Sequence, residues 1–272
     1  MADGRLIFDT VLNSDGVEKG VNSLSGGLKK AASASLKAFT AATAAAATSV
    51  VALGTNAVKS YAEYEQLVGG VETLFKDSQG IVMDYANNAY KTAGLSANEY
   101  MDTVTSFSAS LLQSLDGDTT AAAEKANVAI TDMSDNANKM GTNMQDIQNA
   151  YQGFAKQNYT MLDNLKLGYG GTKEEMSRLL EEASKISGIK YDISSYADII
   201  DAIHVVQEEM DITGTTAKEA STTIEGSVNM TKSAWSNLVT GIADDNQDFN
   251  VLVDNFVTSA STAITNILPR IE

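Results

Sequence analysis

Cysteine is absent from the 272-residue chain, and proline and histidine each occur once, at Pro269 and His204. Without cysteine the chain can have no disulfide, no thiolate metal site and no thiol nucleophile. Because proline breaks helix interiors, a chain almost without it can run as long helices. A single histidine cannot build a typical zinc site, and nothing near His204 in the sequence supplies an obvious catalytic partner.

Positive charge is also scarce, since 19 Lys and Arg stand against 35 Asp and Glu, a formal net charge of −16. Such a chain lacks the cations that neutralise phosphates, so we expect no specific nucleic-acid binding. Adsorption to an anionic membrane is disfavoured for the same reason. The apolar run near the start is short and carries Arg5 and Asp9, which is not the pattern of a signal peptide.

What the chain does have is helical periodicity. Residues 1–16 predict a short strand or extended arm that ends in a turn. Residues 17–94 predict a long Ala-rich helical region, interrupted at Gly69-Gly70. Residues 95–246 predict a core of shorter amphipathic helices, and residues 247–272 the start of a further helical segment. No region alternates with period two for long, so the predicted fold class is all-α.

Apolar stripes at three- and four-residue spacing mark the predicted helices of the core. Possible capping boxes mark where three of them start, at Ser96 with Glu99, Thr172 with Glu175, and Thr216 with Glu219. The stripes are Tyr100, Val104, Phe107, Leu111 and Leu115; Ala126, Ile130, Met133, Ala137 and Met140; Met144, Ile147, Tyr151 and Phe154; Met176, Leu179, Ala183 and Ile186; Ile199, Ile203, Val206 and Met210; Ile224, Val228, Trp235, Leu238 and Ile242; Phe249, Val253, Phe256, Ala260 and Ile267.

Two segments superficially resemble ligand sites. The glycine-rich loop at residues 168–171 precedes Thr172 and Lys173, the reverse of the order in a phosphate-binding loop, and no strand precedes it. We interpret it as a flexible loop before a capped helix. An oxygen-rich segment begins at Asp132, but the sixth and twelfth positions counted from it lack the glycine and glutamate of a calcium loop.

We interpret Asp132, Asp135 and Asn136 as a solvated helix face opposite the apolar stripe. No carboxylate pair stands out as a general acid and base. The separation of two carboxylates in space, which would identify such a pair, is not given by the sequence. We therefore predict no catalytic, cofactor-binding or metal-binding residue, and a protein that is not an enzyme.

Residues 38–58 carry no charge and are long enough for a membrane span. Alanine, threonine and serine dominate this stretch, whereas membrane insertion requires more strongly apolar residues. An alternative function is nevertheless kept open, that of a membrane-inserting helical pore or effector protein that uses residues 38–58.

Several long stretches carry a family resemblance. The most similar reads DMSDNANKMG at residues 132–141, and the similarity continues through AYQGFAKQNYTMLDNL at residues 150–165. Residues 64–75, 85–96, 99–111 and 168–172 belong to the same pattern. Over roughly residues 1–245 the chain resembles the amino-terminal and core region of tail tape measure proteins from phages and prophages of Gram-positive bacteria.

The resemblance implies a structural protein that occupies the lumen of the phage tail tube, sets tail length during assembly and is expelled before the DNA on infection. It implies as partners the tail tube protein, tail-tip proteins and tail assembly chaperones, and a homo-oligomer that is often a trimer. It implies assembly in the host bacterial cytoplasm, location in the virion, and transient contact with the host membrane.

A tape made of helix converts chain length into tube length, at about 1.5 Å per residue. Fully helical, this chain would span only about 400 Å. Its glycines and caps predict shorter, folded helices, so we expect these residues to be a fragment or terminal portion of a longer tape. A third class, a peptidoglycan hydrolase, is disfavoured by the lack of zinc-type histidine pairs and of an evident acidic pair.

Overall fold

The computed structural model describes residues 49–244 and 246–270, and within this part all regular secondary structure is helical, with no strand. The predicted all-α class is confirmed there. The predicted arm at residues 1–16 and the long helical region before residue 49 lie outside the described residues. The α-helices are α3 (Ser49–Phe75), α4 (Gln79–Thr92), α5 (Ala97–Ser114), α6 (Thr119–Met140), α7 (Met144–Phe154), α8 (Lys173–Ser187), α9 (Tyr196–Glu209), α10 (Thr215–Thr222), α11 (Ile224–Gly241) and α12 (Phe249–Ile267), and the 3-10 turns are η1 (Lys76–Ser78), η2 (Leu162–Leu165) and η3 (Leu268–Arg270).

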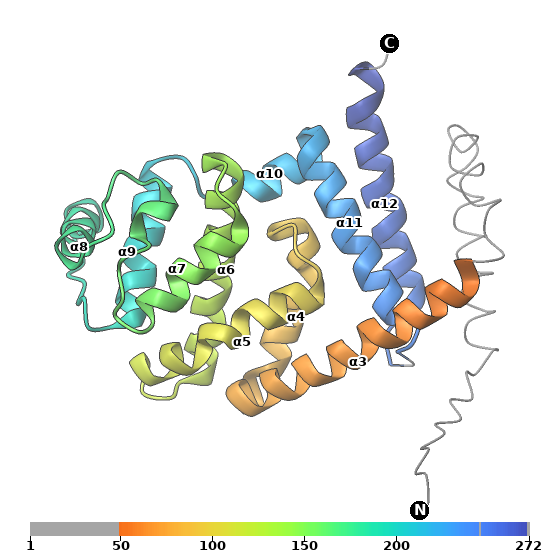
Figure 1. The fold of residues 1–272 in the computed structure, drawn as a ribbon, viewed down its shortest axis with the longest axis horizontal. Coiled ribbons are helices and arrows are strands. Elements are labelled where there is room, and N and C mark those ends of the chain that lie inside the picture. The colour runs from red at the N-terminus through yellow and green to blue at the C-terminus, as the bar shows by residue number, and fades with distance from the viewer. Residues whose placement is uncertain (1–48, 245, 271–272) are drawn as a thin grey trace, which may run out of the picture.

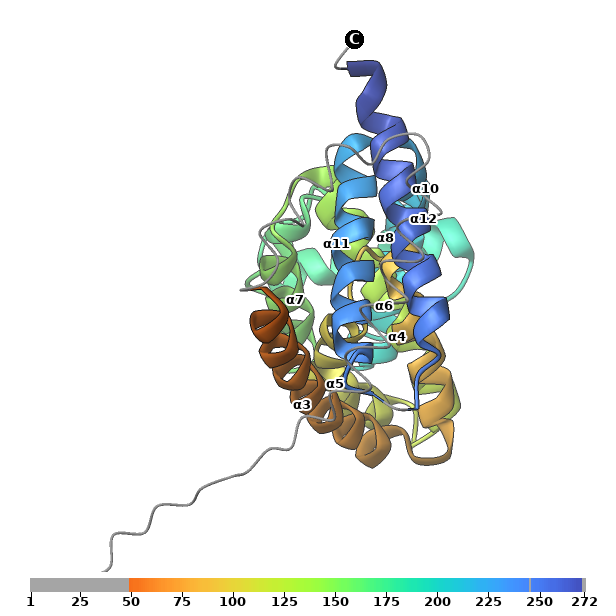
Figure 2. The same cartoon turned by 90° about the vertical axis from the view of Figure 1, so that its right-hand side faces the viewer.

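Two hydrophobic clusters hold these helices together. The larger cluster joins α3 to α9, with fully buried aromatic residues such as Phe75, Tyr100 and Tyr151 at its centre. The smaller cluster is centred on α11 and α12, which run side by side at one end of the molecule (Figure 1, Figure 2), and it includes Tyr90 of α4 and Ala220 of α10. Helix α3 follows one edge of the molecule and contacts both α5 and α11, so it connects the two ends.

Local signals set many of the helix ends. Ser96 and Glu99 form the predicted capping box, since the Ser96 hydroxyl accepts from the Glu99 N–H and the Glu99 carboxylate accepts from the Ser96 N–H. Thr172 caps α8 by accepting from the Glu175 N–H, which confirms one half of that predicted box. Gly141 and Gly188 end α6 and α8 in the left-handed conformation, where glycine carries no steric penalty.

The predicted interruption at Gly69-Gly70 is wrong, because α3 continues through both glycines to Phe75. Each glycine costs a helix about 1 kcal/mol relative to alanine. That cost is offset by tertiary packing, since Val71 and Phe75 are buried in the larger cluster immediately after the glycines. The helix ends instead at Phe75, and the next residue, Lys76, has a positive φ of 48°.

Several predicted stripes are wrong at their ends. Ile186, in the last turn of α8, and Met210, the first residue after α9, are exposed. The stripe predicted for α11 is correct at Leu238, which is fully buried, and wrong at Ile224 and Trp235, which are exposed. Small residues make up much of the face that α11 turns inward. The buried face of α11 comprises Gly226, Ser227, Met230, Ser233, Ala234, Leu238, Val239, Thr240 and Gly241.

Among the described helices, none is both long and apolar enough to cross a membrane. Residues 38–48 of the candidate inserting stretch lie outside the described residues. Ala57, near the end of that stretch, is buried, and Ser60 one turn later shares a hydrogen bond with Thr240 of α11 at 2.5 Å. This end of the stretch therefore packs against the helical domain.

Replacing Gly69 by alanine should raise the free energy of unfolding by about 1 kcal/mol, because the position is helical and an added Cβ would meet no atom within 4 Å. Gly226→Ala is the matched comparison. Its Cβ would collide with the Glu219 backbone where α10 turns into α11, so we expect a loss of about 1–3 kcal/mol. Urea unfolding measures the change in the free energy of unfolding of each variant, a gain for Gly69→Ala and a loss for Gly226→Ala. Equal changes in the two variants would contradict the packing around these glycines.

Candidate functional site

The strongest concentration of buried polar groups lies on one face of α6. Asp132, Asp135 and Asn136 occupy positions i, i+3 and i+4, which share a helix face. Their exposed fractions are 1%, 0% and 0%. The prediction that they form a solvated face is therefore wrong. The sequence shows that they share a face, but not that α9 and the loops before α8 and α10 cover it.

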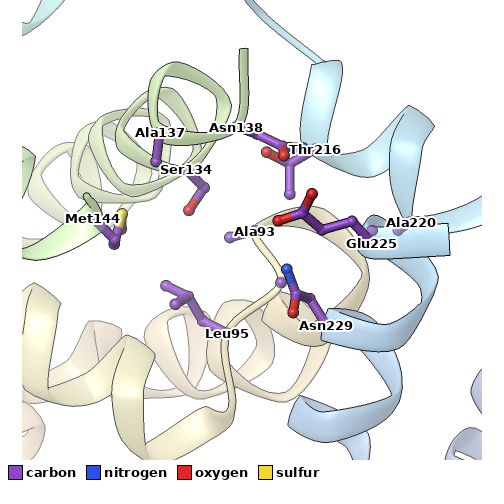
Figure 3. Close-up of a pocket in the computed structure, with 12 residues that line it drawn as sticks. Ala93, Leu95, Ser134, Ala137, Asn138, Met144, Thr216, Ala220, Glu225 and Asn229 are labelled. Atoms are coloured by element: carbon purple, nitrogen blue, oxygen red, sulfur yellow. The ribbon is translucent and has the colours of Figure 1, made fainter. Parts of the chain in front are cut away.

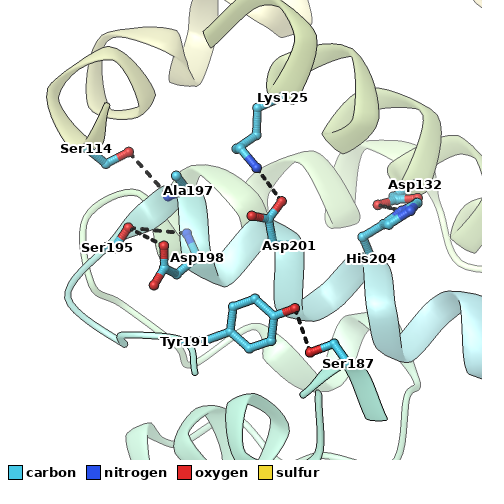
Figure 4. A network of polar contacts seen from close by, with 10 residues as sticks. All are labelled: Ser114, Lys125, Asp132, Ser187, Tyr191, Ser195, Ala197, Asp198, Asp201 and His204. Atoms are coloured by element: carbon cyan, nitrogen blue, oxygen red, sulfur yellow. Dashed lines mark hydrogen bonds and ion pairs between the residues drawn. The ribbon is translucent and has the colours of Figure 1, made fainter. Parts of the chain in front are cut away.

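Asp132 faces His204 of α9. The His204 Nδ1 atom lies 2.9 and 3.0 Å from the two carboxylate oxygens of Asp132 (Figure 4). The sequence around His204 holds no partner for it, and the structure supplies one 72 residues away. A lone histidine and a distant aspartate give no local sequence signal, so only the fold could have joined them.

The pair binds a proton more firmly than its separate members would. Burial raises the pKa of Asp132 to about 6, against the opposing effect of His204. The hydrogen bond to Asp132 raises the pKa of His204, and burial opposes that rise. The other charged groups that act on His204, Glu208 and Asp201, are also carboxylates and raise its pKa further.

Asp135 anchors the start of α10. Its two carboxylate oxygens accept from the Gly214 N–H at 2.6 Å and from the Thr216 N–H at 2.7 Å. These amides belong to the first turn of a helix, where N–H groups lack partners within the helix. Asp135 thus replaces the predicted Thr216–Glu219 capping box, which is wrong because α10 begins at Thr215. Burial raises the pKa of Asp135, and its backbone hydrogen bonds oppose that rise.

Asn136 completes the polar face by holding η2. Its Nδ2 atom donates to the Leu165 carbonyl at 2.9 Å. Next to this contact, Lys166 donates to the Met140 carbonyl at 2.9 Å, so the end of α6 and the turn are linked twice. Three neighbouring side chains of α6 therefore bind three separate parts of the chain, namely η2, α9 and α10.

Further polar contacts fix the position of α9, as Figure 4 shows. The Lys125 ammonium of α6 forms an ion pair with Asp201. The Ala197 N–H, at the start of α9, donates to the Ser114 hydroxyl of α5 at 3.2 Å. Ser195 caps α9 by accepting from the Asp198 N–H. Helix α9 is thus bound to α5 and α6 at points along most of its length.

The glycine-rich loop at residues 168–171 is held by its own neighbours. Glu175 accepts from the Gly170 N–H at 3.1 Å, and Arg178 donates to the Gly168 carbonyl at 2.8 Å. The Arg178 guanidinium also stacks over the Tyr169 ring, 4.3 Å from its centroid. Two backbone N–H groups here could face a phosphate, those of Gly170 and Glu175. Both already have protein acceptors, since the Gly170 N–H donates to the Glu175 carboxylate and the Glu175 N–H donates to the Thr172 hydroxyl.

The polar face of α6 is suited to fixing the fold rather than to bond chemistry. His204 has a carboxylate partner but no hydroxyl nucleophile among its hydrogen-bond partners in the described chain. Within the same residues, no group of three or more His, Asp or Glu side chains is arranged to hold a metal ion. What the arrangement can do is take up a proton and couple that uptake to the contact between α6 and α9.

Stability should fall as the pH rises from 5 to 8. Asp132 and His204 both hold their protons more tightly in the folded chain than in the unfolded chain. Their contribution is therefore present at low pH and is lost as the pH rises through the folded pKa values. Urea unfolding at intervals of pH measures how the free energy of unfolding changes with pH. A double Asp132→Asn, His204→Gln variant should lose most of this pH dependence.

The imidazole NMR signal of His204, the only histidine, reports its pKa directly, and a value at or below 6.5 would count against the ion pair.

Asp135→Ala should destabilise the fold by about 1.5–3 kcal/mol, because two helix-end amides lose a charged acceptor and Thr216 is buried. Asp102→Ala, at an exposed position on α5, is the control and should stay within about 0.5 kcal/mol of the parent. Thermal or urea unfolding measures the stability of the two variants. Equal stabilities would show that Asp135 does not anchor α10.

Compared with models of protein families, with curated proteins and with solved structures, the chain matches none. The geometry of the described residues and the sequence resemblance therefore carry the functional argument.

Proposed function

We propose that this chain is the amino-terminal portion of a phage tail tape measure protein, with a structural and non-enzymatic role in the tail tube lumen. The observation that carries the proposal is where the resembling residues lie. The DMSDNANKMG motif is the polar face of α6 that binds α9, α10 and η2. The second motif, residues 150–165, supplies buried members of the larger cluster, among them Tyr151, Phe154 and Leu165.

These motifs thus serve the architecture of the domain. A motif that carries chemistry is expected to place reactive groups at an accessible cleft. Here the acidic and amide groups are turned inward and are engaged in holding helices together. The all-α fold and the acidic surface also agree with a helical protein that does not adhere to the DNA that follows it through the tube.

The described helices fold back on one another, so this domain does not convert chain length into tube length. Its longest helix, α3, has 27 residues and spans about 40 Å. We propose that the domain is a folded unit at one end of the tape and that extended helical segments outside it measure the tube. The tail tube protein, tail-tip proteins and assembly chaperones are its proposed partners, and the tape is proposed to be a homo-oligomer.

Mass spectrometry of purified tail particles tests the proposal. We expect peptides from this chain at a few copies per tail, quantified against peptides of the tail tube protein, and joined to further sequence of a longer tape. Tails without these peptides would contradict the proposal and favour a soluble assembly factor or an effector.

Tail length gives a second test. A 28-residue helical insertion after Ala45, in the Ala-rich stretch, should lengthen the tail by about 42 Å if that stretch runs along the tube. The same insertion after Lys190, in an exposed loop of the folded domain, is the control and should leave the length unchanged. Electron microscopy measures both lengths, and lengthening by the loop insertion would contradict the folded-unit proposal.

A further inference from the structure

The crevice where α6, α10 and α11 meet has exposed side chains at its rim, Glu225 and Asn229 (Figure 3). Within it the Ser134 hydroxyl makes no hydrogen bond with any described residue, whereas the Thr216 hydroxyl is turned to Asp135. One hydroxyl beside solvent selects no particular ligand. A second set of polar groups is enclosed in the interior, between α7 and α9.

Gln207 of α9 carries an amide into that interior. Its exposed fraction is 0%, and neither its Nε2 nor its Oε1 atom makes a hydrogen bond with any described residue. Because both ends of the amide lack a partner, rotating it to exchange the nitrogen and the oxygen satisfies neither. Buried polar groups are nearly always hydrogen-bonded, since water satisfies them in the unfolded chain.

Tyr151 of α7 brings a hydroxyl to the same place. Its exposed fraction is also 0%, and its hydroxyl makes no hydrogen bond of good geometry with a described residue. Burial raises the pKa of Tyr151, the Asp132 carboxylate raises it further, and the Gln207 amide lowers it. The hydroxyl therefore lies beside the amide. Both are next to the Asp132–His204 pair, because Gln207 follows His204 by one turn on the same face of α9.

A direct contact between Tyr151 and Gln207 cannot satisfy both side chains. If the amide nitrogen donates to the hydroxyl oxygen, the hydroxyl proton and the amide oxygen are left over. If the hydroxyl donates to the amide oxygen, the amide nitrogen and a lone pair of the hydroxyl are left over. In either case one donor and one acceptor remain. A group that fills this place must therefore both accept and donate.

Water meets this requirement, and an ion does not. A cation offers no acceptor for the remaining N–H or O–H group. An anion offers no donor, and it would lie near the Asp132 carboxylate. A water molecule accepts two hydrogen bonds and donates two, and buried water in proteins typically bonds to about three otherwise unsatisfied polar groups.

We propose that the interior between α7 and α9 binds at least one ordered water molecule, which bridges the Tyr151 hydroxyl and the Gln207 amide. The water accepts from the donor that these side chains leave free and donates to the remaining acceptor. It thereby joins α7 to α9 beside the contact between α6 and α9. The inference goes beyond the proposed function, since it concerns the interior of the domain whatever role the domain has.

A crystal structure of the full-length chain, at a resolution that shows ordered water, tests the proposal. We expect a water peak about 2.7–3.2 Å from both the Tyr151 hydroxyl and an atom of the Gln207 amide. Gln207→Met keeps a long unbranched side chain without the amide, so the peak should disappear. Tyr191→Phe is the control and should keep the peak, because the Tyr191 hydroxyl bonds to Ser187 at an exposed position.

The absence of a water peak between Tyr151 and Gln207 in the parent chain would overturn the proposal. Protein groups bonded to both ends of the amide would overturn it as well.

Unfolding of Tyr151→Phe gives an independent test in solution. Removal of a hydroxyl that is bonded to buried water costs stability, so the equilibrium constant for unfolding should rise about fivefold. The control Tyr191→Phe should change this constant by less than about twofold. A buried hydroxyl without a partner contributes only a desolvation cost. An unchanged or lower constant in Tyr151→Phe would therefore overturn the bridge.

Discussion

The fold depends on the need to satisfy three polar side chains that α6 carries into the interior. A carboxylate in a protein core is costly unless hydrogen bonds or a cation compensate it. Asp132 and Asp135 find their compensation only when α9 and the start of α10 are in place. The Asn136 Nδ2 group finds an acceptor when η2 is in place, whereas its Oδ1 atom has no partner among the described residues. The hydrophobic clusters supply most of the driving force, and the polar face joins three separate segments of the chain to α6.

The parts of the structure that could be predicted are those set by local chemistry. Helical periodicity predicts the all-α class, and the Ser96–Glu99 capping box forms as expected because both partners lie within one turn. The predictions fail where distant residues decide. Thr216 was expected to cap α10, but its N–H is taken by Asp135, 81 residues earlier. Gly69 and Gly70 were expected to break a helix, but the burial of Val71 and Phe75 keeps it intact.

The candidate site illustrates the same limit. The spacing of Asp132, Asp135 and Asn136 correctly places them on one helix face, yet a polar face is solvated or buried according to what covers it. Only the fold shows that His204 covers Asp132. The residues that carry the family resemblance lie inside the domain, where they hold α9, α10 and η2 on α6.

Helix α3 has a mechanical consequence. Its amino-terminal part is attached to α11 through contacts such as Ser60 with Thr240, and its carboxyl-terminal part is embedded in the larger cluster at Phe75. Tension applied at Ser49 along the axis of α3 loads these attachments together, in shear. Tension applied across the axis peels them one after another, beginning with α11. The domain should therefore resist a pull along α3 more strongly than a pull to the side, and its anchoring strength depends on the direction from which the preceding chain leaves it.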